Sequence, residues 1–154
     1  MKIIGIDPGN TDTALTIWDI TNKKITYKLL SNNEEILAAL NSFDKKEHIL
    51  AIEMIASYGM PVGKEVFETC FWIGRFYQHF IEANGKAELV YRKDVKLGLC
   101  GTTRAKDGNV RQVVIDRLGK PGTKKNPGVT YGITADLWQS LALCLFCDDK
   151  MNVK

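Results

Sequence analysis

The amino-acid sequence predicts an α/β fold in which helices flank a five-stranded sheet of mixed direction. Three strand-like segments follow one another within the first 30 residues, and further strand-like segments then alternate with helical ones. Successive strands form antiparallel hairpins, whereas strand-helix-strand units form parallel pairs, so one sheet contains both directions. The length of 154 residues fits a single domain that spans residues 1–154.

The first third of the chain has the pattern of a three-stranded meander. Residues 2–7, with the sequence KIIGID, form the nearly continuous apolar run that is typical of a central strand buried on both faces. Residues 14–20 form the second strand, and a polar turn at 21–24 leads into the third strand at 25–30. The three segments therefore predict hairpin-connected strands.

Capping residues and apolar spacing delimit the remaining elements. Asn32 and Asn33 can cap a helix over residues 33–43, and Glu34 and Glu35 suit its positive end. A long helix after Gly63 continues to about residue 83. The other predicted elements are strands over 48–53 and 87–91, helices over 94–99 and 107–118, a Gly-, Pro- and Lys-rich loop over 119–128, and a last helix that Thr134 caps and that continues to about residue 148.

Basic residues are concentrated between positions 92 and 125. Ten Lys and Arg residues against three acidic residues give this segment a charge of +7, in a chain whose formal net charge is +3. Such an excess is typical of a surface that neutralises nucleic-acid phosphates. A solvated basic face without a partner has the same composition and remains an alternative.

The cysteine pattern and the apolar segments bear on compartment and chemistry. Cys144 and Cys147 form a C-x-x-C pair, but zinc needs two further ligands, so the buried stripe of a helix is favoured over metal or redox use. The longest apolar stretch, 137–147, is shorter than the roughly 20 residues of a membrane span. Met1 leads directly into a strand without a signal-peptide pattern, so we expect a cytoplasmic protein with no membrane partner.

Three carboxylates stand where such a fold brings side chains together. Asp7 ends the first strand, Glu53 ends the fourth, and Asp136 lies in the first turn of the last predicted helix. Ligand sites in open α/β sheets form at the carboxyl ends of central strands. Clustered carboxylates usually mark a divalent cation, with Mg²⁺ or Mn²⁺ preferred by hard oxygen ligands. Taken singly, Asp7 can also cap a turn and Asp136 can be an ordinary first-turn acid.

Four motifs in a fixed order resemble the RuvC family of Holliday junction resolvases. They are IGIDPG at residues 4–9, IE at 52–53, GTTRAK at 101–106 and AD at 135–136. The resemblance covers essentially the whole chain and implies an RNase H-like fold. It further implies that Asp7, Glu53 and Asp136 hold two Mg²⁺ ions, for which Mn²⁺ can substitute, with Lys106 or Arg104 near the scissile phosphate. The implied activity is cleavage of a four-way DNA junction by paired nicks, and the implied assembly is a homodimer.

Three positions depart from the family pattern, and one of them is Ala14, where the family often has a glycine. The family places a second carboxylate three residues after the first acid of the last helix, where this chain has Gln139. An amide oxygen can still ligate a metal, so Gln139 is kept among the expected ligands. The family can place a stacking aromatic just after the glutamate, and the candidate for it here is Tyr58, displaced by two positions from the expected site. The residues expected to contact DNA are Tyr58, Arg104, Lys106, Arg111, Lys120, Lys124 and Lys125.

Alternatives remain for both assembly and function. The long helix bearing Phe67, Phe71 and Phe76 is the candidate dimer interface, with core packing as the alternative for each of them. A non-catalytic junction-binding protein, or an RNase H-like nuclease acting on other branched nucleic acids, also fits the sequence. A nucleotide-binding, actin-like fragment is disfavoured because the chain lacks room for a two-domain cleft, so no nucleotide cofactor is expected.

Overall fold

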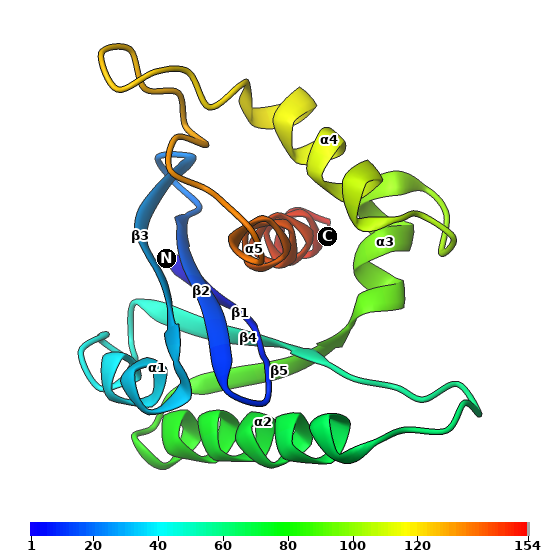
Figure 1. Ribbon diagram of the computed structural model, residues 1–154. Coiled ribbons are helices and arrows are strands. Elements are labelled where there is room, and N and C mark those ends of the chain that lie inside the picture. Colours follow the sequence, from blue (N-terminus) through cyan, green and yellow to red (C-terminus); the bar gives the residue numbers. More distant parts are fainter. Residues whose placement is uncertain (154) are drawn as a thin grey trace.

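The computed structural model describes residues 1–153, which form a five-stranded sheet and five helices (Figure 1). The strands are β1 (Lys2–Asp7), β2 (Asp12–Asp19), β3 (Lys24–Asn32), β4 (His48–Met54) and β5 (Lys86–Tyr91). The helices are α1 (Asn33–Leu40), α2 (Lys64–Glu82), α3 (Arg92–Cys100), α4 (Asp107–Leu118) and α5 (Leu137–Asn152). The predicted elements are all present, and most of their boundaries agree within two residues.

The sheet has the order β3-β2-β1-β4-β5 and contains both strand directions. The first three strands form an antiparallel meander, in which β1 pairs with β2 and β2 pairs with β3. β4 lies parallel to β1 on its other side, and β5 continues parallel to β4. β1 is therefore the central strand, as its continuous apolar sequence predicts. The predicted fold class, an α/β protein with a mixed five-stranded sheet, is confirmed.

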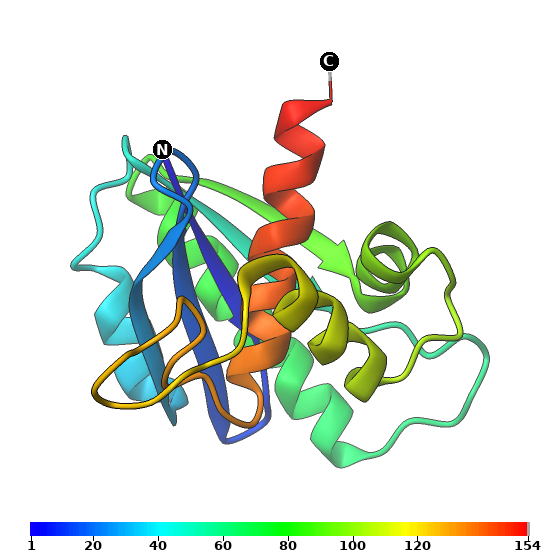
Figure 2. The same ribbon diagram turned by 90° about the horizontal axis from the view of Figure 1, so that it is seen from above.

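Helices cover both faces of the sheet (Figure 1). Alternate residues of β1 point to opposite faces, so Ile4 and Ile6 pack with Phe76 and Phe80 of α2, whereas Ile3 packs on the side of α5. Figure 2 shows the length of α5, with α4 beside it. Within residues 1–153, no helix is both long enough and apolar enough to cross a membrane.

Gly5 lies where α5 comes closest to the sheet. A Cβ atom built at Gly5 would stand 2.4 Å from the Ser140 carbonyl oxygen and 2.6 Å from the Cys144 sulfur. Next to this contact, the hydroxyl oxygens of Thr16 and Ser140 lie 2.6 Å apart and share a hydrogen bond. The absence of a side chain at Gly5 thus allows α5 to pack directly on β1.

Gly5→Ala is expected to lower the free energy of unfolding by about 2 kcal/mol, because the added methyl group must push α5 away from β1. Urea unfolding followed by circular dichroism measures the change. Gly108→Ala in α4 is the matched control, since a Cβ there meets nothing within 4 Å and Ala favours a helix. Equal stability of Gly5→Ala and the wild type would mean that α5 can shift at no cost.

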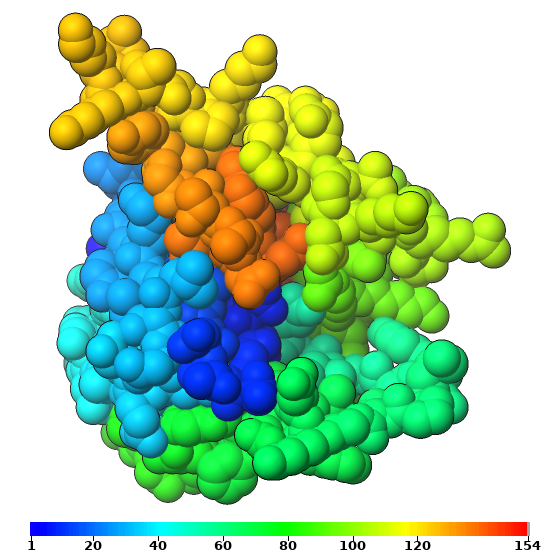
Figure 3. Space-filling model, in the orientation of Figure 1, coloured from blue at the N-terminus to red at the C-terminus, as the bar shows by residue number. Residues whose placement is uncertain are grey.

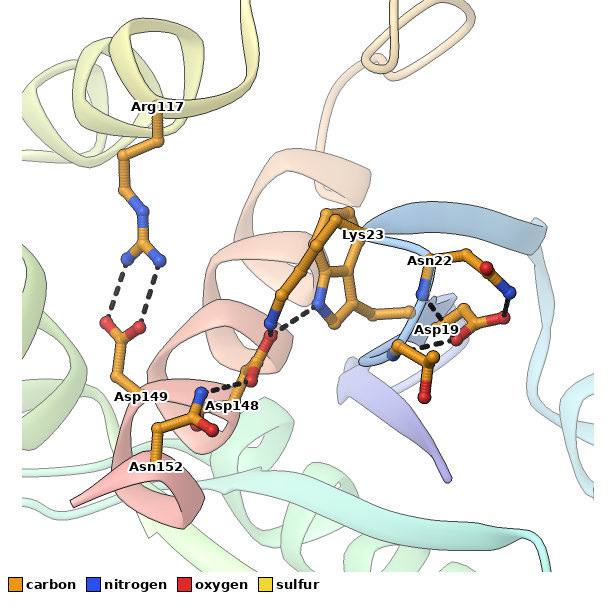
Figure 4. Close-up of polar contacts among 9 residues, drawn as sticks. Asp19, Asn22, Lys23, Arg117, Asp148, Asp149 and Asn152 are labelled. Atoms are coloured by element: carbon orange, nitrogen blue, oxygen red, sulfur yellow. Dashed lines mark hydrogen bonds and ion pairs between the residues drawn. The ribbon is translucent and has the colours of Figure 1, made fainter.

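A buried carboxylate ties the far end of α5 to the meander (Figure 4). One Asp148 oxygen accepts hydrogen bonds from Trp18 Nε1 at 2.8 Å and from Lys23 Nζ at 2.7 Å, and the other accepts one from Asn152 Nδ2 at 2.9 Å. These donors hold the pKa of Asp148 below its ordinary value, although burial alone would raise it. The adjacent Asp149 instead points outward and forms an exposed, two-bond pair with Arg117.

Three predicted helix boundaries are wrong, and one of them is the end of the last helix, which continues to Asn152 rather than to about residue 148. The last helix begins at Leu137 with Asp136 as its N-cap residue, so Thr134 is not the cap and Asp136 precedes the first turn. The reason is Ala135, whose φ of 47° is outside the helical region. The first helix ends at Leu40 rather than at residue 43, because the Asn41 and Ser42 N–H groups bond carbonyls three residues back instead of four. Lys45 Nζ donates hydrogen bonds to the Leu40 and Phe43 carbonyls of the turn that follows.

Candidate active site

Asp7 and Glu53 lie side by side at the carboxyl ends of the neighbouring strands β1 and β4. This end of the strands is called the carboxyl edge of the sheet below. The parallel register pairs Ile6 of β1 with Ile52 of β4, so the next residue on each strand is an acid and both acids leave the same face. That face is the one covered by α5, since Gly5 contacts α5 and Asp7 follows it by two residues. Glu53 is buried and Asp7 is half-buried.

The turn after Asp7 is fixed by a small network of buried polar groups. The Thr13 hydroxyl accepts a hydrogen bond from the Gly9 N–H at 3.3 Å and donates one to the Asn33 side-chain oxygen at 2.6 Å. The Asn33 amide in turn donates to the Gly9 carbonyl at 2.9 Å. Thr13 and Asn33 are almost fully buried. The backbone that carries Asp7 is therefore held on both sides of the turn.

Asp136 and Gln139 approach the same edge from the start of α5. Asp136 is the exposed N-cap residue, and Gln139 lies in the first turn with 8% of its surface exposed. The contact between Gly5 and Ser140 places the first turn of α5 over the end of β1. The negative charge of Asp136 acts on both Asp7 and Glu53, so the three predicted acids are near one another.

The acids oppose one another's ionisation. Burial, together with the charges of Glu53 and Asp136, raises the pKa of Asp7 to about 8. Burial also raises the pKa of Glu53, against the opposing effect of Arg92. No side chain among the described residues donates a hydrogen bond to the Asp7 carboxylate. Of the charges that act on Asp7, only that of Arg92 favours the ionised carboxylate.

The donor set fits a hard divalent cation. Carboxylate and amide oxygens are the ligands that Mg²⁺ and Mn²⁺ prefer, and the half-buried Asp7 carboxylate accepts no hydrogen bond from a described side chain. Within residues 1–153, however, no three His, Cys, Asp or Glu side chains are gathered closely enough to form a ready-made metal site. The acids converge at one edge without closing around a common point. The assignment of Asp7, Glu53, Asp136 and Gln139 as ligands therefore stays a prediction.

Sequence reasoning missed two charged residues at this edge. Arg92, the first residue of α3, places Nη1 3.6 Å from a Glu53 carboxylate oxygen, and its Nη2 pairs with the Asp107 carboxylate. Asp107 begins α4, where the Lys106 N–H donates to the Asn109 side chain at 2.9 Å. The sequence did contain a signal for Arg92. This residue directly follows β5, which is parallel to β4, so it stands at the same carboxyl edge as Glu53. The charge of Asp107 acts on both Asp7 and Glu53.

The predicted DNA-binding residues occupy three separate places. Arg104 and Lys106 are exposed in the segment that leads into α4, and the Arg111 guanidinium lies 5.0 Å from the centre of the Trp138 ring at the start of α5. Lys120, Lys124 and Lys125 are exposed on a loop that projects beyond the end of α4 (Figures 1 and 3). Of these six basic residues, only Arg104, Lys106 and Arg111 therefore come from segments next to the acids.

Tyr58 lies on a projecting loop on the other side of the acids. Its side chain is 64% exposed, and its φ of 49° is unusual for a bulky residue. A cleft of about 410 Å³ separates this loop from α3, and Figure 3 shows a hollow between the corresponding parts of the surface. The cleft is lined by Tyr58, Arg92, Lys93, Lys96 and Thr103.

The strand order, the central buried strand and the acids at its carboxyl end define an RNase H-like fold. Among solved structures, the chain is similar to RuvC of Thermus thermophilus, with a TM-score of 0.71 and 19% identity over 95% of this chain and 92% of that one. RuvC of the same organism in complex with a Holliday junction substrate gives 0.69 and 18% over the same shares. The fowlpox virus resolvase in complex with its substrate Holliday junction DNA gives 0.51 and 12%, over 96% of this chain and 99% of that one.

The likeness to these resolvases is a likeness of fold. No family model matches the sequence, and no curated protein matches it. The resemblance inferred from four short motifs is confirmed at the level of the three-dimensional structure, since the matches span nearly the whole of both chains.

The raised pKa of Asp7 has a consequence for stability without metal. Between the ordinary value of 3.8 and about 8, folded Asp7 keeps a proton that the unfolded chain loses, so stability falls as pH rises through this interval. Asp7→Asn removes this dependence. From about pH 5 to about pH 7, the free energy of unfolding of the variant should rise relative to that of the wild type by about 1.4 kcal/mol per pH unit, the limit for one proton.

Urea unfolding in chelator at several pH values measures this difference. Asp44→Asn is the control, on the exposed turn before β4 at the opposite end of the sheet. The difference between its free energy of unfolding and that of the wild type should be the same at every pH. A constant offset for Asp7→Asn as well would show that Asp7 ionises at its ordinary pKa in the folded protein.

Proposed function

We propose that this protein is a structure-specific DNA endonuclease that resolves four-way junctions by paired, Mg²⁺-dependent nicks. The observation that carries this proposal is the convergence of Asp7, Glu53 and Asp136 at the carboxyl edge of an RNase H-like sheet. The similar folds of T. thermophilus RuvC and of fowlpox virus resolvase, both known in complex with Holliday junction substrates, support the choice of substrate.

The chain's own residues have distinct parts in this reaction. Asp7, Glu53 and Asp136 would hold the ions, with Gln139 contributing an uncharged amide oxygen. When bound, two divalent ions activate water for in-line attack and stabilise the leaving 3′ oxygen. Asp7 must lose its proton before it can ligate, because its pKa is about 8. Cleavage of this kind leaves 5′-phosphate ends.

Basic and aromatic side chains around the acids would hold the DNA. Arg104 and Lys106 supply positive charge near the scissile phosphate, and Tyr58 can stack on an exposed base, a contact worth about 1 to 3 kcal/mol. The others proposed to contact phosphates are Arg111, Lys120, Lys124 and Lys125. Binding should therefore weaken as the salt concentration rises.

Paired nicks require two active sites, and a homodimer supplies them. The exposed face of α2 supports this assembly, because Phe67 and Phe71 are each 64% exposed and lie one helical turn apart. Phe76, the third phenylalanine considered for the interface, is fully buried, so it packs in the core instead. Exposed aromatic residues on one face are typical of protein interfaces.

A second candidate is a protein that binds junctions without cutting them. Two observations favour it, since Gln139 brings no negative charge and Arg92 already partly neutralises Glu53. Both would weaken the attraction for a metal ion.

Cleavage of an end-labelled synthetic four-way junction distinguishes these functions. Matched linear duplex and flap DNA are incubated beside it with Mg²⁺, Mn²⁺ or chelator. The proposed function requires symmetric nicks, confined to the junction and dependent on metal. Cutting of every branched substrate would indicate a broader RNase H-like nuclease, and tight binding without cutting in any metal would indicate the junction-binding protein.

Gln139→Asp is expected to lower the Mg²⁺ concentration that gives half-maximal cleavage by about tenfold, because it adds a negative charge beside the ions. The measurement is a metal titration of the cleavage rate, with Gln139→Leu as the control that removes the amide but keeps the buried volume. Misfolding of Gln139→Asp alone would mean that this buried side chain belongs to the core.

A further inference from the structure

Arg92 belongs both to the acidic site and to the adjoining cleft. Its guanidinium pairs with Glu53 and Asp107, and the same side chain lines the cleft between the Tyr58 loop and α3. Among the described residues, no other basic side chain forms an ion pair with Asp7, Glu53 or Asp136. Arg92 therefore joins the cleft to the acids, because one side chain lines the cleft and pairs with Glu53.

The cleft itself has the chemistry of a phosphate-binding channel. Arg92, Lys93 and Lys96 all come from the first two turns of α3, and no acidic residue lines the cleft with them. The Lys93 ammonium lies 5.7 Å from the centre of the Tyr58 ring on the opposite wall. Cations beside an exposed aromatic ring are typical of sites that hold a nucleic-acid strand.

We propose that Arg92 is a catalytic residue that binds the DNA phosphate nearest the acids, and that Lys93 and Lys96 bind the adjoining phosphates of the same strand. This inference rests on the proposed function, in which the phosphate nearest the acids is the scissile one. Asp107 is then a positioning residue that holds the guanidinium in place. It is a partner of Arg92 and not a fourth metal ligand.

The contacts of Arg92 leave donors for a phosphate. A guanidinium has five N–H donors, and of its two carboxylate partners only Asp107 accepts a hydrogen bond, from Nη2, while Glu53 forms an ion pair with Nη1 at 3.6 Å. N–H donors on both Nη atoms are therefore left for a phosphate oxygen. The side chain is 37% exposed and thus accessible from the cleft. Its Nε is buried without a hydrogen-bond partner, a costly state for which a functional role of the side chain is one explanation.

The first arm of the test measures binding and needs no cleavage. Fluorescence anisotropy of a labelled four-way junction, in chelator and over a range of salt concentrations, compares the wild type with Arg92→Ala, Lys93→Ala and Lys96→Ala. Each variant should bind more weakly and reduce the slope of log K against log salt by about 0.9, the value for one phosphate contact. Lys86→Ala, at the other end of β5, should leave the slope unchanged.

The second arm measures the single-turnover cleavage rate at saturating enzyme. Arg92→Ala should lower this rate by about 100-fold, the effect of removing one donor to transition-state charge, whereas Lys86→Ala should cleave at the wild-type rate. Arg92→Lys, which keeps the charge, should recover part of the loss. A saturated rate of Arg92→Ala equal to that of the wild type would overturn the catalytic role.

Asp107 is tested by its dependence on Arg92. Asp107→Asn should lower the saturated rate with little change in junction affinity, and it should have no further effect when combined with Arg92→Ala. Additive effects of the two changes would overturn the positioning role.

Failure of the proposed function is distinguishable from failure of this inference. If the wild type cuts no branched DNA in Mg²⁺ or Mn²⁺, the nuclease function is rejected, while reduced salt slopes of the three α3 variants would still support the phosphate channel. Unchanged salt slopes in all three would overturn the channel whether or not the protein cleaves DNA.

Discussion

Asp7→Asn is expected to abolish junction cleavage while junction binding stays intact or improves. Asparagine keeps the size of the side chain but removes the charge that attracts the ions, and several kcal/mol of transition-state stabilisation depend on those ions. At about 1.4 kcal/mol per factor of ten, the rate should fall by at least about 10³-fold. The basic surface is unchanged, so phosphate contacts remain.

The measurement pairs a cleavage assay in Mg²⁺ with a binding assay in chelator. Asp44→Asn removes one negative charge from the opposite end of the sheet and should cleave and bind as the wild type does. Cleavage by Asp7→Asn at more than a tenth of the wild-type rate would contradict the assignment of the site. Loss of binding together with cleavage would point to misfolding, which the urea unfolding curve of the same variant detects.

Asp148→Ala is expected to lower the free energy of unfolding by about 3 kcal/mol. The change removes the acceptor of three hydrogen bonds and leaves the Trp18 indole N–H buried without a partner. Because the pKa of Asp148 is held below its ordinary value, the contribution is present at neutral pH and is lost as the pH falls through that lowered pKa.

The neighbouring residue gives a closely matched control. Asp149→Ala breaks only the exposed pair with Arg117, so it should cost less than about 1 kcal/mol. Thermal or urea unfolding at neutral pH compares the two variants (Figure 4). Similar losses for both would mean that the buried network stabilises the fold no more than a surface ion pair does.

Local patterns in the sequence were sufficient for the elements and for two of the three acids. Apolar runs that end in a carboxylate predicted β1 and β4, and the parallel register of these strands then brings Asp7 and Glu53 together. The start of α5 was misjudged because it depends on the positive φ of Ala135, which a sequence pattern does not reveal.

Other features depend on contacts between distant parts of the chain. Arg92 was counted as one of ten basic residues, but its pairing with Glu53 arises only when β5 lies beside β4. Phe67 and Phe76 both belong to α2, yet Phe67 is exposed and Phe76 is buried. The difference arises because the position of the sheet decides which face of the helix is buried. The candidate cleft likewise joins a loop and a helix that the sequence separates by more than 30 positions.

The close packing of α5 on β1 has a consequence for the order in which the protein is made. Thr16 and Ser140, which bond where the first strands meet this helix, are 124 positions apart in the chain. During synthesis, the sheet emerges from the ribosome long before the helix that covers it. The acidic edge is therefore incomplete in the nascent chain, and the apolar face around Gly5 needs protection until α5 has been synthesised.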